Sequence, residues 1–224
     1  MQSLGKPRRR NAVAAAASRL VKALACRWLL ATVIDQRESE VDAQAVAWDA
    51  VPRHRAYVGL GGNLGDVQAH FRSALRGLNG CAATCVEAVS SLYRTRPVDS
   101  PGPDYLNAVA AIQSALGPHE LLRALQQLEW AHDRERPYRN APRTLDLDLL
   151  SYGGLVLADP VLTLPHPRMM VRAFVLTPLA ELMAFFGDDG RQSGLRLPDL
   201  ATQVALAKSQ GIERLGPAPD WRIG

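Results

Sequence analysis

The spacing of apolar residues predicts a domain of alternating strands and helices from residue 56 onward. Apolar side chains at every second position indicate strands, and apolar side chains at every third or fourth position indicate helices. Strands are expected at residues 56–60, 84–93, 105–114, 142–150 and 155–157. Helices are expected at residues 67–78, capped by Asp66, and at residues 118–132, 174–183 and 197–208. The apolar stripe of the second helix is expected to contain Leu121, Leu122, Leu125, Leu128 and Trp130.

The expected strand at residues 142–150 places two acidic side chains on one face. Alternation along a strand puts the leucines on the opposite face, at Leu145, Leu147 and Leu149. Thr144, Asp146 and Asp148 then share the polar face, where successive side chains lie about 6.6–7 Å apart. Two carboxylates at that spacing repel, so a cation must offset the repulsion. Mg²⁺ is the first candidate, because it usually binds through one or two carboxylates and substrate phosphates.

A basic segment leads into this strand. Residues 133–143 contain four arginines, broken by prolines, and end at Arg143, whose planar guanidinium matches a phosphate group. A phosphate bound between arginines and Mg²⁺ would accommodate both signs of charge. The alternative is an exposed strand face with solvated acids. The other motifs must decide between this alternative and a site for metal and phosphate.

Charge is divided unevenly along the 224 residues, whose formal net charge is +4. Residues 1–55 hold ten Lys or Arg against five Asp or Glu, a net of +5, and residues 56–224 hold sixteen against seventeen, a net of −1. The second part therefore lacks the basic character typical of a nucleic-acid-binding domain. An apolar content of 47% is enough for a substantial core.

The cysteines and the apolar runs indicate a cytoplasmic protein. Cys26, Cys81 and Cys85 are odd in number and have no metal-type spacing, which favours reduced thiols. No apolar run approaches the ~18–20 residues needed to cross a bilayer.

The first 55 residues differ in composition from the rest. Residues 1–25 are basic and rich in Ala, which fits a transit peptide, a misassigned start site or an inert extension, and we favour the last two. Residues 35–55 are polar and of mixed charge, as in a linker. We expect a poorly ordered extension at residues 1–55 and one domain at residues 56–224, so a chain that starts near Arg55 should fold.

Four further features bear on a binding site. The glycine-rich turn at residues 61–66 has neither a Walker Lys-Ser/Thr nor Gly-X-Gly-X-X-Gly spacing, so close backbone packing is its expected role. Residues 94–104, with three prolines and a glycine, are expected to form a long binding loop. Asn107 shares a strand face with Tyr105, and its amide could bind either a heterocycle or neighbouring backbone. His166 lies between two prolines, which should fix its direction.

Five motifs, taken in order, resemble those of the 6-hydroxymethyl-7,8-dihydropterin pyrophosphokinases of folate biosynthesis. They are Gly-Gly-Asn-Leu-Gly-Asp at 61–66, Ser-Leu-Tyr-Arg-Thr at 91–95, Asp-Tyr-Leu-Asn at 104–107, Ala-Pro-Arg-Thr-Leu-Asp-Leu-Asp at 141–148 and Pro-His-Pro-Arg-Met at 165–169. The resemblance runs from about residue 56 to about residue 215, and the block at 142–148 is its most specific part.

The resemblance implies an α+β fold with a ferredoxin-like core, in which a mostly antiparallel sheet has helices packed on both sides. It implies a monomeric cytoplasmic enzyme that transfers pyrophosphate from ATP to the pterin and binds neither nucleic acid nor membrane. It implies two Mg²⁺ ions bound by Asp146 and Asp148, with Arg134 and Arg143 next to the transferred group. The implied pterin-binding residues are Thr95, Val98, Tyr105, Asn107 and Phe174. The implied ATP-binding residues are Gln126, Arg136, Leu149, Thr163, His166 and Arg172.

The chain departs from the family pattern at a few positions. Gly62 stands where a small hydroxyl residue is common, and Met170 and Val171 replace a pair that is often polar. Asn140 occupies a place where some relatives carry a tryptophan that stacks on the pterin. Stacking from that side is therefore either missing or supplied by Tyr138.

Two other classes of protein are alternatives to the pyrophosphokinase. A ferredoxin-like module that binds RNA or a protein should have a basic domain and aromatic residues on an open sheet face, yet only 6% of residues are aromatic. A nucleotide-sugar glycosyltransferase could use Asp146 and Asp148 as its metal motif. It would need a doubly wound nucleotide-binding domain, which residues 56–224 hardly accommodate.

Overall fold

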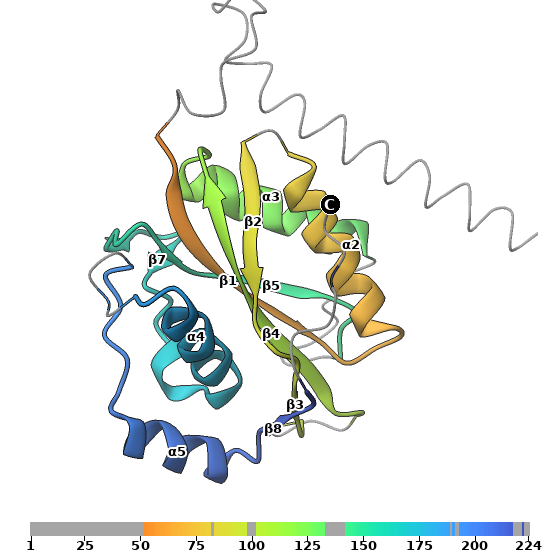
Figure 1. Ribbon diagram of the computed structural model, residues 1–224. Helices are drawn as coiled ribbons and strands as arrows, with labels where there is room; N and C mark the ends of the chain where they lie inside the picture. The colour runs from red at the N-terminus through yellow and green to blue at the C-terminus, as the bar shows by residue number, and fades with distance from the viewer. Residues whose placement is uncertain are drawn as a thin grey trace, which may run out of the picture. The chain divides into compact units, whose positions relative to one another are not determined.

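The computed structural model describes residues 52–81, 83–97, 102–132, 142–188, 190, 193–216 and 221. Within these residues the chain forms a six-stranded sheet, a two-stranded sheet and four α-helices (Figure 1). The strands of the large sheet are β1 (His54–Gly62), β2 (Thr84–Val89), β3 (Tyr93–Thr95), β4 (Tyr105–Ser114), β5 (Asp146–Tyr152) and β8 (Glu213–Arg214). The small sheet consists of β6 (Leu157–Ala158) and β7 (Thr163–Leu164). The helices are α2 (Val67–Asn79), α3 (Pro118–Ala131), α4 (Ala173–Phe185) and α5 (Leu200–Ser209), with the short 3₁₀ helix η2 (Met169–Val171) before α4.

The large sheet is ordered β5-β1-β4-β3-β8, and β2 also pairs with β4. All five strand pairings in this sheet are antiparallel: β1 with β4, β1 with β5, β2 with β4, β3 with β4 and β3 with β8. The prediction of a mixed fold with a mostly antiparallel sheet is therefore confirmed, whereas the ferredoxin-like core and the sandwich of helices stay predictions. The domain boundary at residue 55 also stays a prediction, and β1 already pairs with β4 at His54 and Arg55.

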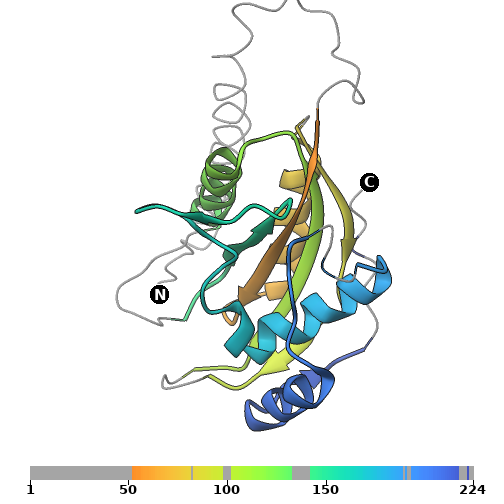
Figure 2. The ribbon, with the colours of Figure 1, turned by 90° about the vertical axis from the view of Figure 1, so that its left-hand side faces the viewer.

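One face of the sheet packs against α4. Tyr57 of β1, Val109 of β4 and Leu150 of β5 are almost fully buried and belong to one apolar cluster with α4. The helix contributes Val175, Leu179, Leu182 and Met183 to this cluster. The other helices contact different parts of the sheet, α2 at β2 and α3 at β5, and α5 lies against α4 (Figure 2). Because side chains alternate along a strand, the same face continues along β5 to Asp148 and Asp146.

Several local predictions are confirmed. β4 spans Tyr105–Ser114, the range predicted. The Asp66 side chain accepts a hydrogen bond from the Ala69 N–H at 3.0 Å and caps α2, as expected. Gly153 and Gly154 form the turn that follows β5, and both have positive φ angles. Among the described residues no helix combines the length and the apolar character needed to cross a bilayer.

The predicted strand at residues 84–93 is wrong as a single element. It divides into β2 and β3 at Ser90 and Ser91, which are buried. The Ser90 hydroxyl accepts the N–H of Val109 at 3.0 Å and donates to the Ser91 carbonyl at 2.8 Å. A side chain therefore replaces part of the backbone ladder here, which apolar spacing alone does not reveal.

The apolar stripe predicted for α3 contains one error. Trp130 is 66% exposed, whereas its neighbour Glu129 is 2% exposed. A Glu129 carboxylate oxygen accepts the N–H of Leu147 in β5 at 2.6 Å, so the acid takes the inward position and the tryptophan faces out. Hydrophobicity alone predicts a buried Trp130 and an exposed Glu129, because it takes no account of this hydrogen bond.

Other elements begin or end at different residues. β5 begins at Asp146 rather than at residue 142, and α5 begins at Leu200 because Pro198 disfavours helix before it and Asp199 caps it. The strand predicted at residues 155–157 is β6 instead, because the Leu155 N–H donates to the Tyr152 carbonyl and extends the turn. The spacing of apolar residues does not predict the short elements β7, η2 and β8.

Glu181 of α4 joins three elements through one carboxylate. Its oxygens accept hydrogen bonds from the Ser91 hydroxyl and the Tyr93 hydroxyl, each at 2.7 Å, and Oε1 lies 3.4 Å from an Arg214 nitrogen. Burial alone would raise the pKa of Glu181, but the hydrogen bonds from Ser91 and Tyr93 lower it below its usual value. The carboxylate therefore stabilises the fold while it is ionised.

We expect Glu181→Gln to lower the free energy of unfolding by about 1–2 kcal/mol at pH 7, because it removes charge-assisted hydrogen bonds. A group whose pKa is lowered by folding stabilises the native state above its unfolded pKa, and this contribution is lost as the pH falls through the folded pKa. The difference from the unmodified chain should therefore shrink between pH 7 and pH 3 in urea denaturation. Glu213→Gln, which alters the exposed ion pair with Arg94, is the control, and it should lower the free energy of unfolding by less than Glu181→Gln does. A difference that grows toward low pH would contradict the assignment.

Candidate active site

A cavity of about 370 Å³ opens on the face of the sheet that also packs against α4. Its lining comes from β1, β3, β4, β5, the first turn of α4 with the segment that leads into it, and Gln210 at the end of α5. Eight of the residues implied by the family resemblance line it: Thr95, Tyr105, Asn107, Arg143, Asp146, Asp148, Arg172 and Phe174. Residues far apart in the sequence are thus brought together in one site.

The floor of the cavity is made by two glycines of β1. Gly61 pairs with Asn107 on one side and with Asp146 on the other, and Gly59 pairs with Asp148. A Cβ atom added at Gly61 would lie 3.6 Å from Asn107 Oδ1 and 3.8 Å from Asp146 Cβ, which is ordinary contact. A larger side chain at Gly61 would extend into the cavity, so glycine leaves room here for a ligand.

Gly62 has a different role. A Cβ atom at Gly62 would lie 2.6 Å from the Thr144 carbonyl oxygen and 3.1 Å from a Val67 methyl carbon. The expectation that these glycines permit close backbone packing is confirmed at this position.

One wall of the cavity is acidic. Asp146 and Asp148 lie on the same face of β5, and each faces an arginine. Arg143 Nη1 lies 2.9 Å from Asp146 Oδ2, and Arg172 Nη1 lies 3.9 Å from Asp148 Oδ2. Burial and the charge of Asp146 raise the pKa of Asp148, although the nearby cations oppose the shift. The expected pair of repelling carboxylates is therefore present in the structure.

Asn63, in the turn after β1, fixes the backbone of Arg143. The Arg143 N–H donates to Asn63 Oδ1 at 2.8 Å, and the Asn63 N–H donates to the Arg143 carbonyl at 2.9 Å. Asn63 Nδ2 also donates to the Pro103 carbonyl at 3.2 Å. The glycine-rich turn thus acts on the cavity by positioning an arginine next to β5.

His166 interacts electrostatically with Asp148 of the acidic wall. Its backbone N–H donates to the Leu150 carbonyl at 2.8 Å, and its Nδ1 accepts the Arg168 N–H at 3.2 Å. The neutral imidazole therefore carries its proton on Nε2. Burial and the charges of Arg172 and Arg168 lower the pKa of His166, and Asp148 opposes this shift.

The opposite end of the cavity combines an amide and two aromatic rings. Asn107 and Thr95 are 5% and 6% exposed, and Asn107 Nδ2 donates to Thr95 Oγ1 at 3.0 Å. The guanidinium carbon of Arg172 lies 5.4 Å from the centre of the Phe174 ring. The guanidinium carbon of Arg143 lies 6.0 Å from the centre of the Tyr105 ring. This end can hold a flat, polar-edged ligand, and the acidic end can hold cations.

A metal at the acidic wall would need ligands beyond the protein. Among the described residues, no group of three or more His, Cys, Asp or Glu side chains is arranged to hold a metal ion. Two adjacent carboxylates do suit Mg²⁺, which commonly takes its other ligands from water and substrate phosphates.

Some predicted site residues lie away from the cavity lining. Gln126 is exposed on α3, Thr163 is exposed in β7, and Leu149 is 3% exposed in β5, where it alternates with Asp148. His166 acts electrostatically on Asp148. Val98, Arg134 and Arg136 lie outside the described residues, so their roles stay predictions.

Several residues that line the cavity are not among the predicted site residues. They include Gly59, Gly61, Arg96, Arg168, Val175 and Gln210. Arg96 and Arg168 stood next to predicted site residues, so their positive charge was a usable signal. Gln210 gave no such signal, because it follows α5 in a segment without a recognised motif.

Comparison with known proteins identifies the family. The model of the 7,8-dihydro-6-hydroxymethylpterin-pyrophosphokinase family matches residues 57–184. A 2-amino-4-hydroxy-6-hydroxymethyldihydropteridine pyrophosphokinase of Synechocystis is 43% identical over 151 residues, 67% of this chain and 76% of that protein. Proteins of the same name from Pseudomonas aeruginosa and Methylorubrum extorquens are 41% identical over 165 residues and 43% identical over 169 residues. Each match covers 72% of this chain, with 96% of the Pseudomonas protein and 98% of the Methylorubrum protein. The resemblance inferred from the five motifs is confirmed.

We expect Gly61→Val to block ligand binding while the chain stays folded. The new Cβ fits at ordinary distances and valine favours strands, but its methyl groups would occupy the cavity floor between Asn107 and Asp146. Affinity for the pterin, measured by titration calorimetry, should fall about tenfold or more. Thermal unfolding of the same samples provides the control, and unchanged affinity in a folded variant would show that the ligand binds elsewhere.

Proposed function

Because the chain belongs to the 7,8-dihydro-6-hydroxymethylpterin-pyrophosphokinase family, we propose that it transfers the pyrophosphoryl group of ATP to 6-hydroxymethyl-7,8-dihydropterin. The products are AMP and the pterin diphosphate. One observation carries this proposal: a single cavity joins the Asp146 and Asp148 wall to the Asn107 and Phe174 end. Family membership decides against both the RNA-binding module and the glycosyltransferase.

The pterin is proposed to bind at the amide-and-ring end. With Nδ2 directed to Thr95, Asn107 keeps its Oδ1 as an acceptor for the amino or ring N–H groups of a pterin. Phe174 offers a flat surface for stacking, and Tyr105 lines the same end. Val98 is proposed to contribute from the loop outside the described residues.

The acidic wall is proposed to hold two Mg²⁺ ions through Asp146 and Asp148. Bound there with ATP, the ions would neutralise phosphate charge on both sides of the bond that is broken. The residues present fit this role because burial and mutual repulsion leave the carboxylate pair in need of positive charge.

The arginines are proposed to position the triphosphate. Phosphoryl-type transfer depends on alignment and charge neutralisation more than on covalent catalysis. Arg143 is fixed by Asn63 next to Asp146, and Arg172 lies beside Asp148, so their guanidinium groups flank the acidic wall. Arg134 and Arg136 are proposed to add charge from the preceding segment, and His166 to bind ATP through Nε2–H. Gln126, Leu149 and Thr163 are proposed to bind ATP farther from the reacting groups.

The same proposal includes the type of fold, the oligomeric state and the cellular location. A ferredoxin-like α-β-α sandwich is supported by the burial of both faces of β5, with Leu150 packing toward α4 and Leu149 alternating with it. A monomeric cytoplasmic enzyme is the expected form.

The products of the reaction test the function directly. Incubation with ATP, Mg²⁺ and 6-hydroxymethyl-7,8-dihydropterin should yield AMP and the pterin diphosphate in equal amounts, because the pterin hydroxyl attacks the β-phosphorus. Chromatography of nucleotides and pterins measures both products, and omission of Mg²⁺ is the control. Formation of ADP with a pterin monophosphate would contradict the mechanism even with the right substrate.

Asp148→Asn should lower turnover by about 10³-fold or more, because it removes a proposed ligand of the metal ions. The fold should persist, since the change keeps the side-chain shape and relieves repulsion with Asp146. Asp199→Asn is the matched control, because Asp199 caps α5 and asparagine caps a helix equally well. Near-normal turnover in Asp148→Asn would refute the metal-binding role.

A further inference from the structure

Gln210 joins the end of α5 to the backbone on both sides of Arg172. Gln210 Oε1 accepts the Ala173 N–H at 2.8 Å, and Gln210 Nε2 donates to the Val171 carbonyl at 2.9 Å. Gln210 also lines the cavity. One amide therefore bridges η2 and α4 at the residue that lies between them.

The first turn of α4 needs such a partner. The first N–H groups of a helix have no acceptor within it, and a side chain at the N-cap position usually supplies one. The N-cap residue of α4 is Arg172, which makes no capping hydrogen bond through its side chain. Gln210, distant in sequence, satisfies the Ala173 N–H in its place.

The bridged segment carries two groups that face the cavity. Arg172 lies 3.9 Å from Asp148 and 5.4 Å from the Phe174 ring centre. The backbone path from Val171 to Phe174 thus determines where the guanidinium stands relative to both the carboxylate and the ring.

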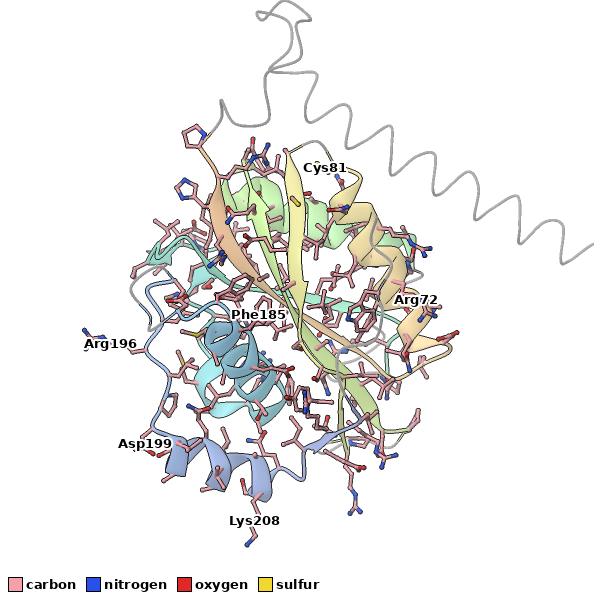
Figure 3. All side chains as sticks on the ribbon, in the orientation of Figure 1. Arg72, Cys81, Phe185, Arg196, Asp199 and Lys208 are labelled. Atoms are coloured by element: carbon pink, nitrogen blue, oxygen red, sulfur yellow. The ribbon has the colours of Figure 1, made fainter. Side chains whose placement is uncertain are left out.

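Gln210 is itself held in place. Its N–H donates to the Leu206 carbonyl at 3.0 Å at the end of α5, and Gly211 follows with a φ of +60° that turns the chain toward β8. β8 then pairs with β3, the strand that carries Thr95. Lys208, two residues before Gln210, points away from the rest of the domain (Figure 3). The end of α5 thus directs the glutamine inward and the lysine to solvent.

We propose that Gln210 is a positioning residue for the reaction, acting through Arg172 and Phe174. This inference rests on the proposed function. It assigns a role to the segment after residue 184, beyond the range that the family model matches. Without the amide, the segment around Arg172 loses its two hydrogen bonds to the end of α5, and the cation and ring no longer keep a fixed relation to Asp148.

The test compares Gln210→Ala, Gln210→Glu and Gln203→Ala. Gln203 lies in α5, the helix that ends just before Gln210, and its Nε2 donates to the Pro198 carbonyl at 2.7 Å, away from the residues that line the cavity. Glutamate at position 210 keeps an acceptor for the Ala173 N–H but loses the donor to Val171. The measurements are kcat, KM for the pterin and KM for ATP from AMP formation, with thermal unfolding midpoints for each variant.

We expect kcat/KM for the pterin to fall about tenfold in Gln210→Ala, with a raised pterin KM, because small displacements of positioning groups are costly. The kcat/KM of Gln210→Glu should lie between those of Gln210→Ala and the unmodified chain. The kcat/KM of Gln203→Ala should stay within about twofold of the value for the unmodified chain. A purely structural defect would instead lower the amount of folded enzyme and leave KM unchanged.

Two outcomes separate this inference from the proposed function. If the unmodified chain forms no AMP, the proposed function fails and the inference fails with it. If the unmodified chain is active, but Gln210→Ala matches Gln203→Ala or changes kcat alone, only the inference is overturned.

Discussion

Two carboxylates on one face of a strand repel each other, and the arrangement of the site follows from offsetting that repulsion. Asp146 and Asp148 are held side by side by the pairing of β5 with β1, so they cannot separate. Arg143 and Arg172 provide positive charge at the two ends of the pair. Neither arginine is fixed by its ion pair alone, because Asn63 holds the backbone at Arg143 and Gln210 holds the backbone around Arg172. The acidic wall thus depends on two neutral amides from distant parts of the chain.

The same strand pairing creates the space for a ligand. β1 lies between the strand that carries Asn107 and the strand that carries the two acids, and it contributes glycine where their side chains face each other. A central strand normally fills this position with a packed side chain. On this face the apolar cluster of Tyr57, Val109 and Leu150 packs against α4, and the cavity lies beside that cluster, over Gly59 and Gly61. One face of one sheet therefore provides both a core and a binding site.

The sequence predicted those parts of the fold and the site whose cause is local. The alternation in β4, the cap of α2 and the shared face of Asp146 and Asp148 all follow from neighbouring residues, and the structure contains them. Two of the errors arose where a distant polar contact overrides hydrophobicity. Glu129 is buried because it accepts an N–H from β5, and the strand predicted through Ser90 breaks because a hydroxyl replaces part of the ladder. Gln210 could not be found from its neighbours, because its partners lie near Arg172, about forty residues earlier in the chain.

The hydrogen bonds made by the side-chain amides of Asn63 and Gln210 also determine how the site responds to ionic strength. Salt screens interactions between exposed charges, so added electrolyte weakens the attraction of phosphate groups to the arginines. Hydrogen bonds from Asn63 and Gln210 to backbone atoms involve no net charge and are little affected by screening. A concentrated electrolyte would therefore weaken the capture of an anionic substrate while the backbone frame that carries the cations keeps its shape.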